Sequence, residues 1–133
     1  MASFRGGCMI GFTASSFDLL HAGHIEMLKD CKENCDYLIV GLNLNPTNKA
    51  AVQSAMERFV QLQGCKYIDE IIPYESEQDL ENLLLLKVID RRFLGEDYIN
   101  RKFTGDHLDI EIHYNDRSHG FSTSELRERC KTS

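Results

Sequence analysis

The run DYLIVGLNL, residues 36–44, is the feature that most constrains the fold of this 133-residue chain. Its apolar residues follow one another without the polar alternation expected of a strand that has one face in water. A continuous apolar strand is typical of a parallel sheet covered on both faces. Parallel strands need crossover connections, usually helices, so the rest of the chain should alternate between strand and helix.

The remaining patterns fit that alternation. Short apolar runs and helical spacing predict further strands at 8–13, 69–74, 92–95 and 109–114, and helices at 23–35, 53–65, 76–91 and 122–131. In the helix predicted at 53–65, Met56, Phe59, Val60 and Gln63 share one face. We therefore expect an α/β fold, a Rossmann-like open parallel sheet with helices on both faces. At this length one domain should span residues 1–133.

Charge and cysteine content narrow the class of protein. The formal net charge of −6 argues against broad binding to nucleic acid or to an anionic membrane. The N-terminus lacks a signal-peptide pattern and no apolar run reaches membrane-spanning length, which predicts a cytoplasmic protein. The five cysteines include no CxxC pair, so we expect reduced thiols and no zinc site.

The stretch SSFDLLHAGH, residues 15–24, contains two of the five histidines, His21 and His24. The first strand should end near Thr13 and the first helix should begin near His21. The stretch is then a strand-to-helix corner at the carboxyl edge of the sheet, where such folds bind ligands. Two imidazoles could ligate a metal, act as acid or base, or bind an anion. The helix N-terminus and the absence of further metal ligands nearby favour phosphate.

A second stretch, RSHGFSTSELRER at 117–129, carries hydroxyl and guanidinium groups. Ser122 and Glu125 have capping-box spacing, so a well-capped helix is one interpretation. Arg117, Ser122, Thr123, Ser124 and Arg127 also suit phosphate oxygens. Two helix starts of this kind indicate a polyphosphate lying between them.

Four motifs now resemble one family: FDLLHAGH, KYIDEIIP at 66–73, FLGEDY at 93–98 and RSHGFST at 117–123. They resemble the HxGH nucleotidyltransferase superfamily and, within it, the short bacterial cytidylyltransferases, most closely those that act on glycerol 3-phosphate. The four motifs stand in the family's order and extend over nearly the whole chain.

The resemblance implies a transferase that moves CMP from CTP to a small phosphorylated alcohol, glycerol 3-phosphate foremost, and releases pyrophosphate. It implies Mg²⁺ bound with the nucleotide phosphates, no metal ligand among the protein's own side chains, and a homodimer. Two alternatives stay open. One is an adenylyltransferase of the same fold acting on a phosphosugar, a flavin or a pantetheine phosphate. The other is a nucleotide-binding module without catalytic activity.

The resemblance also assigns roles to residues. The catalytic residues would be His21, His24, Lys49 and Arg117. The nucleotide-binding residues would be Ser16, Phe17, His21, His24, Gly95, Asp97, Arg117, Ser122, Thr123 and Ser124. The acceptor-binding residues would be Asp18 and Arg58. Residue chemistry alone leaves other interpretations open: Phe17 as core, Asp18 as a turn residue, Lys49 as solvated surface, and Arg58 in a surface salt bridge.

The sequence departs from the family pattern at the corner itself. Ser15 and Ser16 stand where relatives carry glycine and threonine, and Tyr98 stands where they carry tryptophan. Ser16 keeps a hydroxyl. Ser15 adds a side chain at a position where backbone could approach a phosphate closely.

Overall fold

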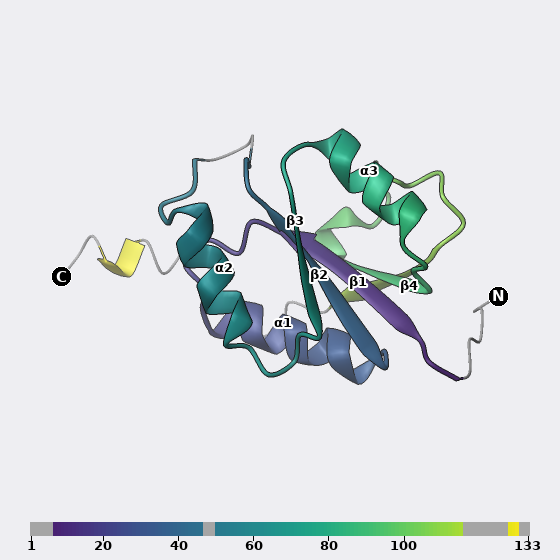
Figure 1. Cartoon of the computed structure of the whole chain (residues 1–133), viewed down its shortest axis with the longest axis horizontal. Helices are drawn as coiled ribbons and strands as arrows, with labels where there is room; N and C mark the ends of the chain where they lie inside the picture. Colours follow the sequence, from purple (N-terminus) through teal and green to yellow (C-terminus); the bar gives the residue numbers. More distant parts are fainter. Residues whose placement is uncertain (1–6, 47–49, 116–127, 131–133) are drawn as a thin grey trace.

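Five strands form one parallel sheet in the computed structural model, which describes residues 7–46, 50–115 and 128–130 (Figure 1). The strands are β1 (Ile10–Ser15), β2 (Tyr37–Asn43), β3 (Glu70–Tyr74), β4 (Arg91–Gly95) and β5 (Glu111–Asn115). Their order in the sheet is β3-β2-β1-β4-β5, and every neighbouring pair is parallel. The predicted open parallel α/β sheet is confirmed.

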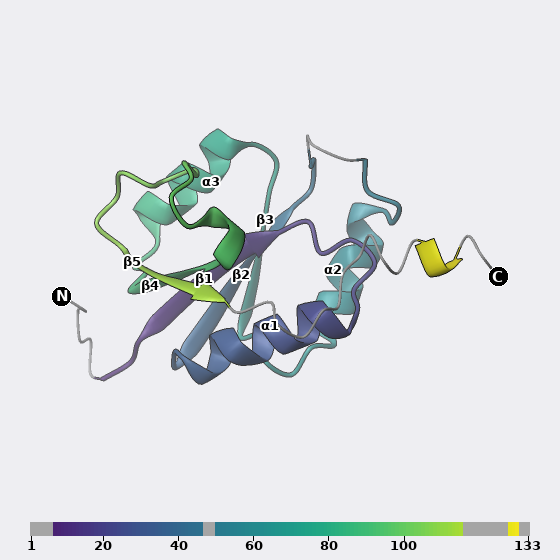
Figure 2. The same ribbon diagram turned by 180° about the vertical axis from the view of Figure 1, so that it is seen from behind.

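Helices cover both faces of the sheet, as predicted. They are α1 (Ala22–Glu33), α2 (Ala55–Gln63) and α3 (Glu77–Leu86), with a single 3-10 turn, η1 (Glu96–Tyr98). Helices α1 and α2 lie on one face and α3 lies on the other (Figures 1 and 2).

The position of β2 between two layers of helices explains why its sequence is apolar throughout. Leu38, Val40 and Leu42 are buried in a cluster with Leu28 of α1 and Leu62 of α2. The intervening Ile39 belongs to a second cluster, with Phe12 of β1 and with Leu80, Leu83 and Leu84 of α3. Alternate side chains along β2 therefore fill two cores on opposite faces of the sheet.

The apolar pattern of α2 did not identify its buried face. Met56 and Val60 are 69% and 56% exposed, although they share the face expected from the sequence. The buried residues are Leu62 and, four positions earlier, Arg58, which is 2% exposed. A charged residue usually marks the solvent-exposed side of a helix. The sequence pattern therefore assigned the side of α2 that contains Arg58 to solvent, although this side faces the sheet.

Most element boundaries differ from the prediction by one or two residues, and the end of α3 differs by five. Strand β1 continues to Ser15, two residues beyond Thr13. Helix α3 ends at Leu86 rather than Arg91, because the chain becomes extended at Lys87 and enters β4 beside β1. Of the helix predicted at 122–131, residues 128–130 are helical and the others lie outside the described residues. No helix in the described part of the chain is long and apolar enough to cross a membrane.

The strand order places a switch point between β1 and β4. From β1 the chain moves through β2 to β3 on one side, whereas β4 and β5 lie on the other side. Ligands of open α/β sheets bind at the carboxyl ends of the strands that flank such a point. Those ends are Ser15 of β1 and Gly95 of β4.

Candidate active site

The corner between β1 and α1 has an unusual backbone. Phe17 and Leu19 have φ values of 51° and 53°, in the left-handed region that favours glycine. Such a conformation costs a non-glycine residue about 1–3 kcal/mol and persists where surrounding contacts impose it. The corner is therefore held in place by other parts of the molecule.

His21 and His24 cap the start of α1 reciprocally. His21 is the N-cap residue, and its Nδ1 accepts a hydrogen bond from the Gly23 N–H at 2.9 Å. The Nδ1 of His24 accepts from the backbone N–H of His21 at 3.2 Å. An Nδ1 that accepts a hydrogen bond bears no proton, so each neutral ring carries its proton on Nε2. The two ring centroids lie 4.1 Å apart.

This geometry suits an anion. The two rings are side by side and each has an Nε2–H donor, which is the group that a phosphate oxygen accepts from. The start of α1 adds the positive end of a helix dipole. Its first turn contains no acidic residue that would neutralise that end, whereas α2 has Glu57 and α3 has Glu77 and Asp79 in theirs.

Phe17 supports this corner from the core. Its ring is 1% exposed and packs in the cluster that contains Leu28 and Leu38. The ring centroid lies 5.6 Å from that of His24. The interpretation of Phe17 as a core residue is confirmed, and its contact with a nucleotide stays a prediction. Ser15, at the end of β1, accepts a hydrogen bond at its hydroxyl from the Phe17 N–H at 3.5 Å.

Asp18 joins the corner to the loop that precedes α2. Its carboxylate is 7% exposed and accepts from the backbone N–H groups of Val52 and Gln53, each at 2.9 Å. These partners lie more than 30 residues away along the chain, so Asp18 does more than stabilise its own turn. The role of Asp18 in binding an acceptor stays a prediction.

Arg58 connects three segments of the chain, one of them in the corner, by hydrogen bonds. Its guanidinium donates to the carbonyl oxygens of four residues, at 2.6 to 3.3 Å: Ser16, Asn43, Leu44 and Gln53. An arginine has five N–H groups, so most of its donor capacity is used on backbone. The surface salt-bridge interpretation is wrong because Arg58 is buried. Contact between Arg58 and an acceptor stays a prediction, and its observed role is to hold the corner.

The remaining predicted residues divide between two places. Ser16 is half-buried within the corner. Gly95 and Asp97 follow the neighbouring strand β4, where Gly95 is half-buried and Asp97 is exposed. The structure thus brings both groups to the carboxyl edge of the sheet, on the two sides of the switch point. Six predicted residues lie outside the described residues: Lys49, Arg117, Ser122, Thr123, Ser124 and Arg127.

Sequence reasoning missed Gln53. Its side-chain Oε1 accepts a hydrogen bond at 2.8 Å from the N–H of Leu19, one of the two left-handed residues. A polar residue before a helix cap is common, so Gln53 gave no local signal. Its importance depends on a partner 34 residues earlier in the chain.

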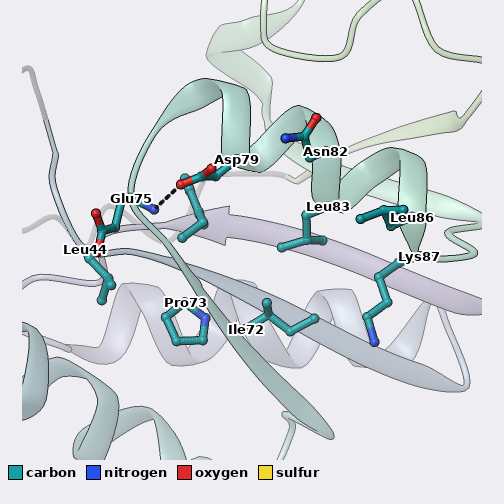
Figure 3. A pocket seen from close by; sticks show the side chains of 10 residues that line it. Leu44, Ile72, Pro73, Glu75, Asp79, Asn82, Leu83, Leu86 and Lys87 are labelled. Carbon is teal, nitrogen blue, oxygen red and sulfur yellow. Dashed lines mark hydrogen bonds between the residues drawn. The ribbon is translucent and has the colours of Figure 1, made fainter.

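A separate open cavity of about 470 Å³ lies between β3 and α3, the helix that covers the sheet face opposite α1 (Figure 3). It is lined by apolar side chains that include Pro73 and Leu83, with Asp79 and Lys87 among its polar residues. Asp79 accepts a hydrogen bond from the backbone N–H of Glu75 at 3.3 Å. None of the described site residues lines this cavity, so we place the candidate active site at the histidine corner.

The parallel sheet, with the histidine corner at its switch point, defines a Rossmann-like α/β protein. The model of the Cytidylyltransferase-like family matches residues 12–129, and the chain belongs to this family.

Curated relatives have similar sequences over most of the chain. Glycerol-3-phosphate cytidylyltransferase of Bacillus subtilis (strain 168) is 32% identical over 120 residues, which cover 87% of this chain and 92% of that enzyme. The bifunctional protein HldE of Helicobacter pylori (strain HPAG1) is 32% identical over 128 residues, or 92% of this chain. The chain spans only 27% of HldE.

Solved structures share the fold. A lipopolysaccharide core biosynthesis protein from Thermoplasma volcanium GSS1 has a TM-score of 0.68 at 25% identity, over 83% of this chain and all of that one. A nicotinate-nucleotide adenylyltransferase assigned in Vibrio parahaemolyticus has a TM-score of 0.60 over 94% of this chain and 88% of its own. At 11% identity the second structure shows the fold alone.

Proposed function

We propose that this protein transfers CMP from CTP to a small phosphorylated alcohol, with glycerol 3-phosphate as the leading acceptor, and releases pyrophosphate. The observation that carries the proposal is the reciprocal capping of α1 by His21 and His24. It gives an anionic substrate two imidazole donors and a helix N-terminus whose first turn contains no acidic residue.

The reaction needs no covalent enzyme intermediate. An oxygen of the acceptor phosphate attacks the α-phosphorus of CTP in line, and a new P–O bond forms. The bond from the α-phosphorus to the bridging oxygen breaks, and its electron pair leaves with pyrophosphate. His21 and His24 donate Nε2–H hydrogen bonds to the phosphate oxygens, whose charge is redistributed in the transition state. Catalysis is then positioning combined with electrostatic stabilisation.

Mg²⁺ is the proposed companion of the nucleotide. It neutralises phosphate charge when bound, and it commonly keeps several waters while phosphate oxygens hold it. In the described part of the chain, no three His, Cys, Asp or Glu side chains group in a way that could hold a metal. The residues present thus suit an ion that arrives with the triphosphate.

The proposed contacts on the far side of the triphosphate come from the C-terminal stretch. Arg117 and the Ser122, Thr123 and Ser124 segment would bind the β- and γ-phosphates, and Lys49 would add a charge near the reacting phosphates. Gly95 and Asp97, at the end of β4, would lie beside the base and ribose. The position of these two residues across the switch point from the histidines supports that assignment.

The choice of acceptor is drawn from the relative whose length this chain covers almost completely. Glycerol-3-phosphate cytidylyltransferase of B. subtilis supports glycerol 3-phosphate, because this chain covers 92% of its length. The second candidate is an adenylyltransferase of the same fold that acts on a phosphosugar, a flavin or a pantetheine phosphate.

A panel experiment separates these candidates. CTP and ATP are each paired with glycerol 3-phosphate, a panel of sugar phosphates, flavin mononucleotide and pantetheine phosphate, and pyrophosphate release is measured with Mg²⁺ present. We expect the highest kcat/KM for CTP with glycerol 3-phosphate. Higher activity with ATP and a phosphosugar would instead establish the second candidate.

A nucleotide-binding module without turnover is the remaining alternative, and Ser15 is the residue that would favour it. If the Ser15 side chain obstructs the phosphate, the parent should bind CTP without releasing pyrophosphate, and Ser15→Gly should restore release. We expect the parent to turn over.

We also propose a homodimer. The KYIDEIIP stretch includes β3, which is an edge strand of the sheet, and an edge strand can be covered by a second chain. Light scattering at micromolar concentration should give a mass of twice the monomer, and a monomeric mass would contradict this.

A further inference from the structure

Gln53 lies outside the set of residues that the family motifs assign, yet it contacts the corner directly. It is the residue before Ser54, the N-cap of α2, and it is half-buried. Its side-chain Oε1 accepts the backbone N–H of Leu19 at 2.8 Å. Leu19 lies two residues before His21 and has a φ of 53°.

The contact is part of a two-way connection. The Asp18 side chain accepts the backbone N–H groups of Val52 and Gln53, while the Gln53 side chain accepts the backbone N–H of Leu19. Thus a side chain of the corner binds the backbone before α2, and a side chain before α2 binds the backbone of the corner. The corner therefore cannot shift relative to residues 52 and 53 without breaking several hydrogen bonds.

Gln53 is itself fixed from α2. Its backbone carbonyl accepts from Nε of Arg58 at 3.3 Å, and the same guanidinium donates to the carbonyl of Ser16 at 3.0 Å. Arg58 is buried and lies on the α2 face that packs against the sheet. The position of Gln53 is thus determined by its contact with the buried Arg58 side chain.

We infer that Gln53 is a positioning residue for nucleotidyl transfer: its amide oxygen holds Leu19 in the left-handed conformation that places His21 and His24. The inference rests on the proposed role of the two histidines in phosphate binding. It assigns Gln53 no contact with substrate. The hydrogen bond to Leu19 offsets part of the cost of a left-handed leucine, which otherwise favours a different corner.

The test compares two replacements at position 53. Gln53→Met keeps the length of the side chain and removes the hydrogen-bond acceptor, whereas Gln53→Glu keeps an acceptor oxygen at the same distance. Gln63→Met is the matched control, because Gln63 is the exposed last residue of α2, the helix that Gln53 precedes. The first readout is the ¹⁵N chemical shifts of the ring nitrogens of His21 and His24 in the protein without substrate. The second is the rate of pyrophosphate release with CTP and glycerol 3-phosphate.

In the parent and in Gln63→Met, the ring signals should report neutral imidazoles protonated at Nε2. Gln53→Met should move the signals of both rings and lower kcat by about tenfold, because misplaced groups lose rate steeply. Gln53→Glu should keep the parental ring signals. A merely structural role would lower the unfolding temperature without separating the Met and Glu variants by their histidine signals.

Two outcomes would overturn the inference: parental histidine signals in Gln53→Met, or equal displacement of the signals in both variants. The ring readout needs no substrate. A failure of the proposed reaction, in which no pair of substrates yields pyrophosphate, is therefore distinguishable from a failure of the role given to Gln53.

Discussion

Helices α1 and α2 begin with the same hydrogen-bond pattern and different chemistry. In α2, Ser54 accepts the Glu57 N–H at 3.2 Å and Glu57 accepts the Ser54 N–H at 2.9 Å. In α1, the reciprocal partners are His21 and His24. The α2 pair brings a carboxylate to the positive end of its own helix, whereas the α1 pair brings two neutral rings with N–H donors.

The difference explains why we propose the binding site at the start of α1 and not at the start of α2. A helix that supplies its own negative charge has satisfied its N-terminus and gains nothing from an external anion. A helix capped by imidazoles satisfies its backbone donors and still attracts an anion. The α1 start also requires the left-handed Phe17 and Leu19 before it, so it depends on contacts from elsewhere in the molecule.

The largest expected effect comes from breaking the α1 pair. His21→Ala and His24→Ala should each lower kcat for pyrophosphate release by about 100-fold or more, the magnitude for losing one transition-state hydrogen-bond donor. The fold should survive, because loss of a cap costs about 1 kcal/mol. Circular dichroism checks the fold, and steady-state kinetics with CTP checks the rate. Near-parental turnover in either variant would remove that histidine from the mechanism.

Asp18→Asn tests the connection between the two helix starts. The amide offers one acceptor oxygen, so one of the two N–H groups from Val52 and Gln53 loses its partner. A hydrogen bond to a charged group contributes about 1.5–3 kcal/mol, and urea unfolding should show a loss of this size. Glu26→Gln, an amide replacement at an exposed position of α1, is the control. Unchanged stability would mean that the connection does not hold the corner.

Ser54→Ala removes the N-cap side chain of α2, as His21→Ala does in α1. Removal of the N-cap hydroxyl should lower the free energy of unfolding by about 1 kcal/mol. The value of kcat should stay within about twofold, since this capping pair contacts no substrate and a surface change of this kind acts on stability alone. Urea titration and kinetics on the same preparation measure both quantities. A large loss of kcat would show that the two helix starts are not distinct in function.

The smallest expected effect concerns the reactivity of two thiols, one within α1 and one just after its end. Burial raises the pKa of the Cys31 thiol far above its ordinary value and that of Cys35 to about 11. Both are therefore neutral thiols at about pH 8, the region in which ordinary thiols ionise. Iodoacetamide at that pH should modify the exposed Cys8 and Cys130 and leave Cys31 and Cys35 unmodified, as read by mass spectrometry. The same protection in His21→Ala would show that only the start of the helix has changed.

The sequence was sufficient for the sheet and for the corner, because both produce local patterns. The continuous apolar run of β2 required two covered faces, and the HAGH spacing at a predicted strand-to-helix boundary located the histidine corner. It was insufficient for Arg58, whose four carbonyl partners come from three separate segments. It was insufficient for Gln53 for the same reason. Local spacing carries no information about partners brought together only by the folded chain.

The four carbonyl contacts of Arg58 have a consequence for how the protein opens. A buried guanidinium separated from its carbonyl partners would lose hydrogen bonds without water to replace them, so partial separation of these segments is unfavourable. The ends of β1 and β2 and the start of α2 should therefore unfold together as one cooperative unit. In native-state hydrogen exchange, the amides of Leu19, Val52 and Gln53 should exchange with a common free energy and a common dependence on denaturant. On this basis the histidine corner has no independent local melting transition, although it lies in a connecting segment.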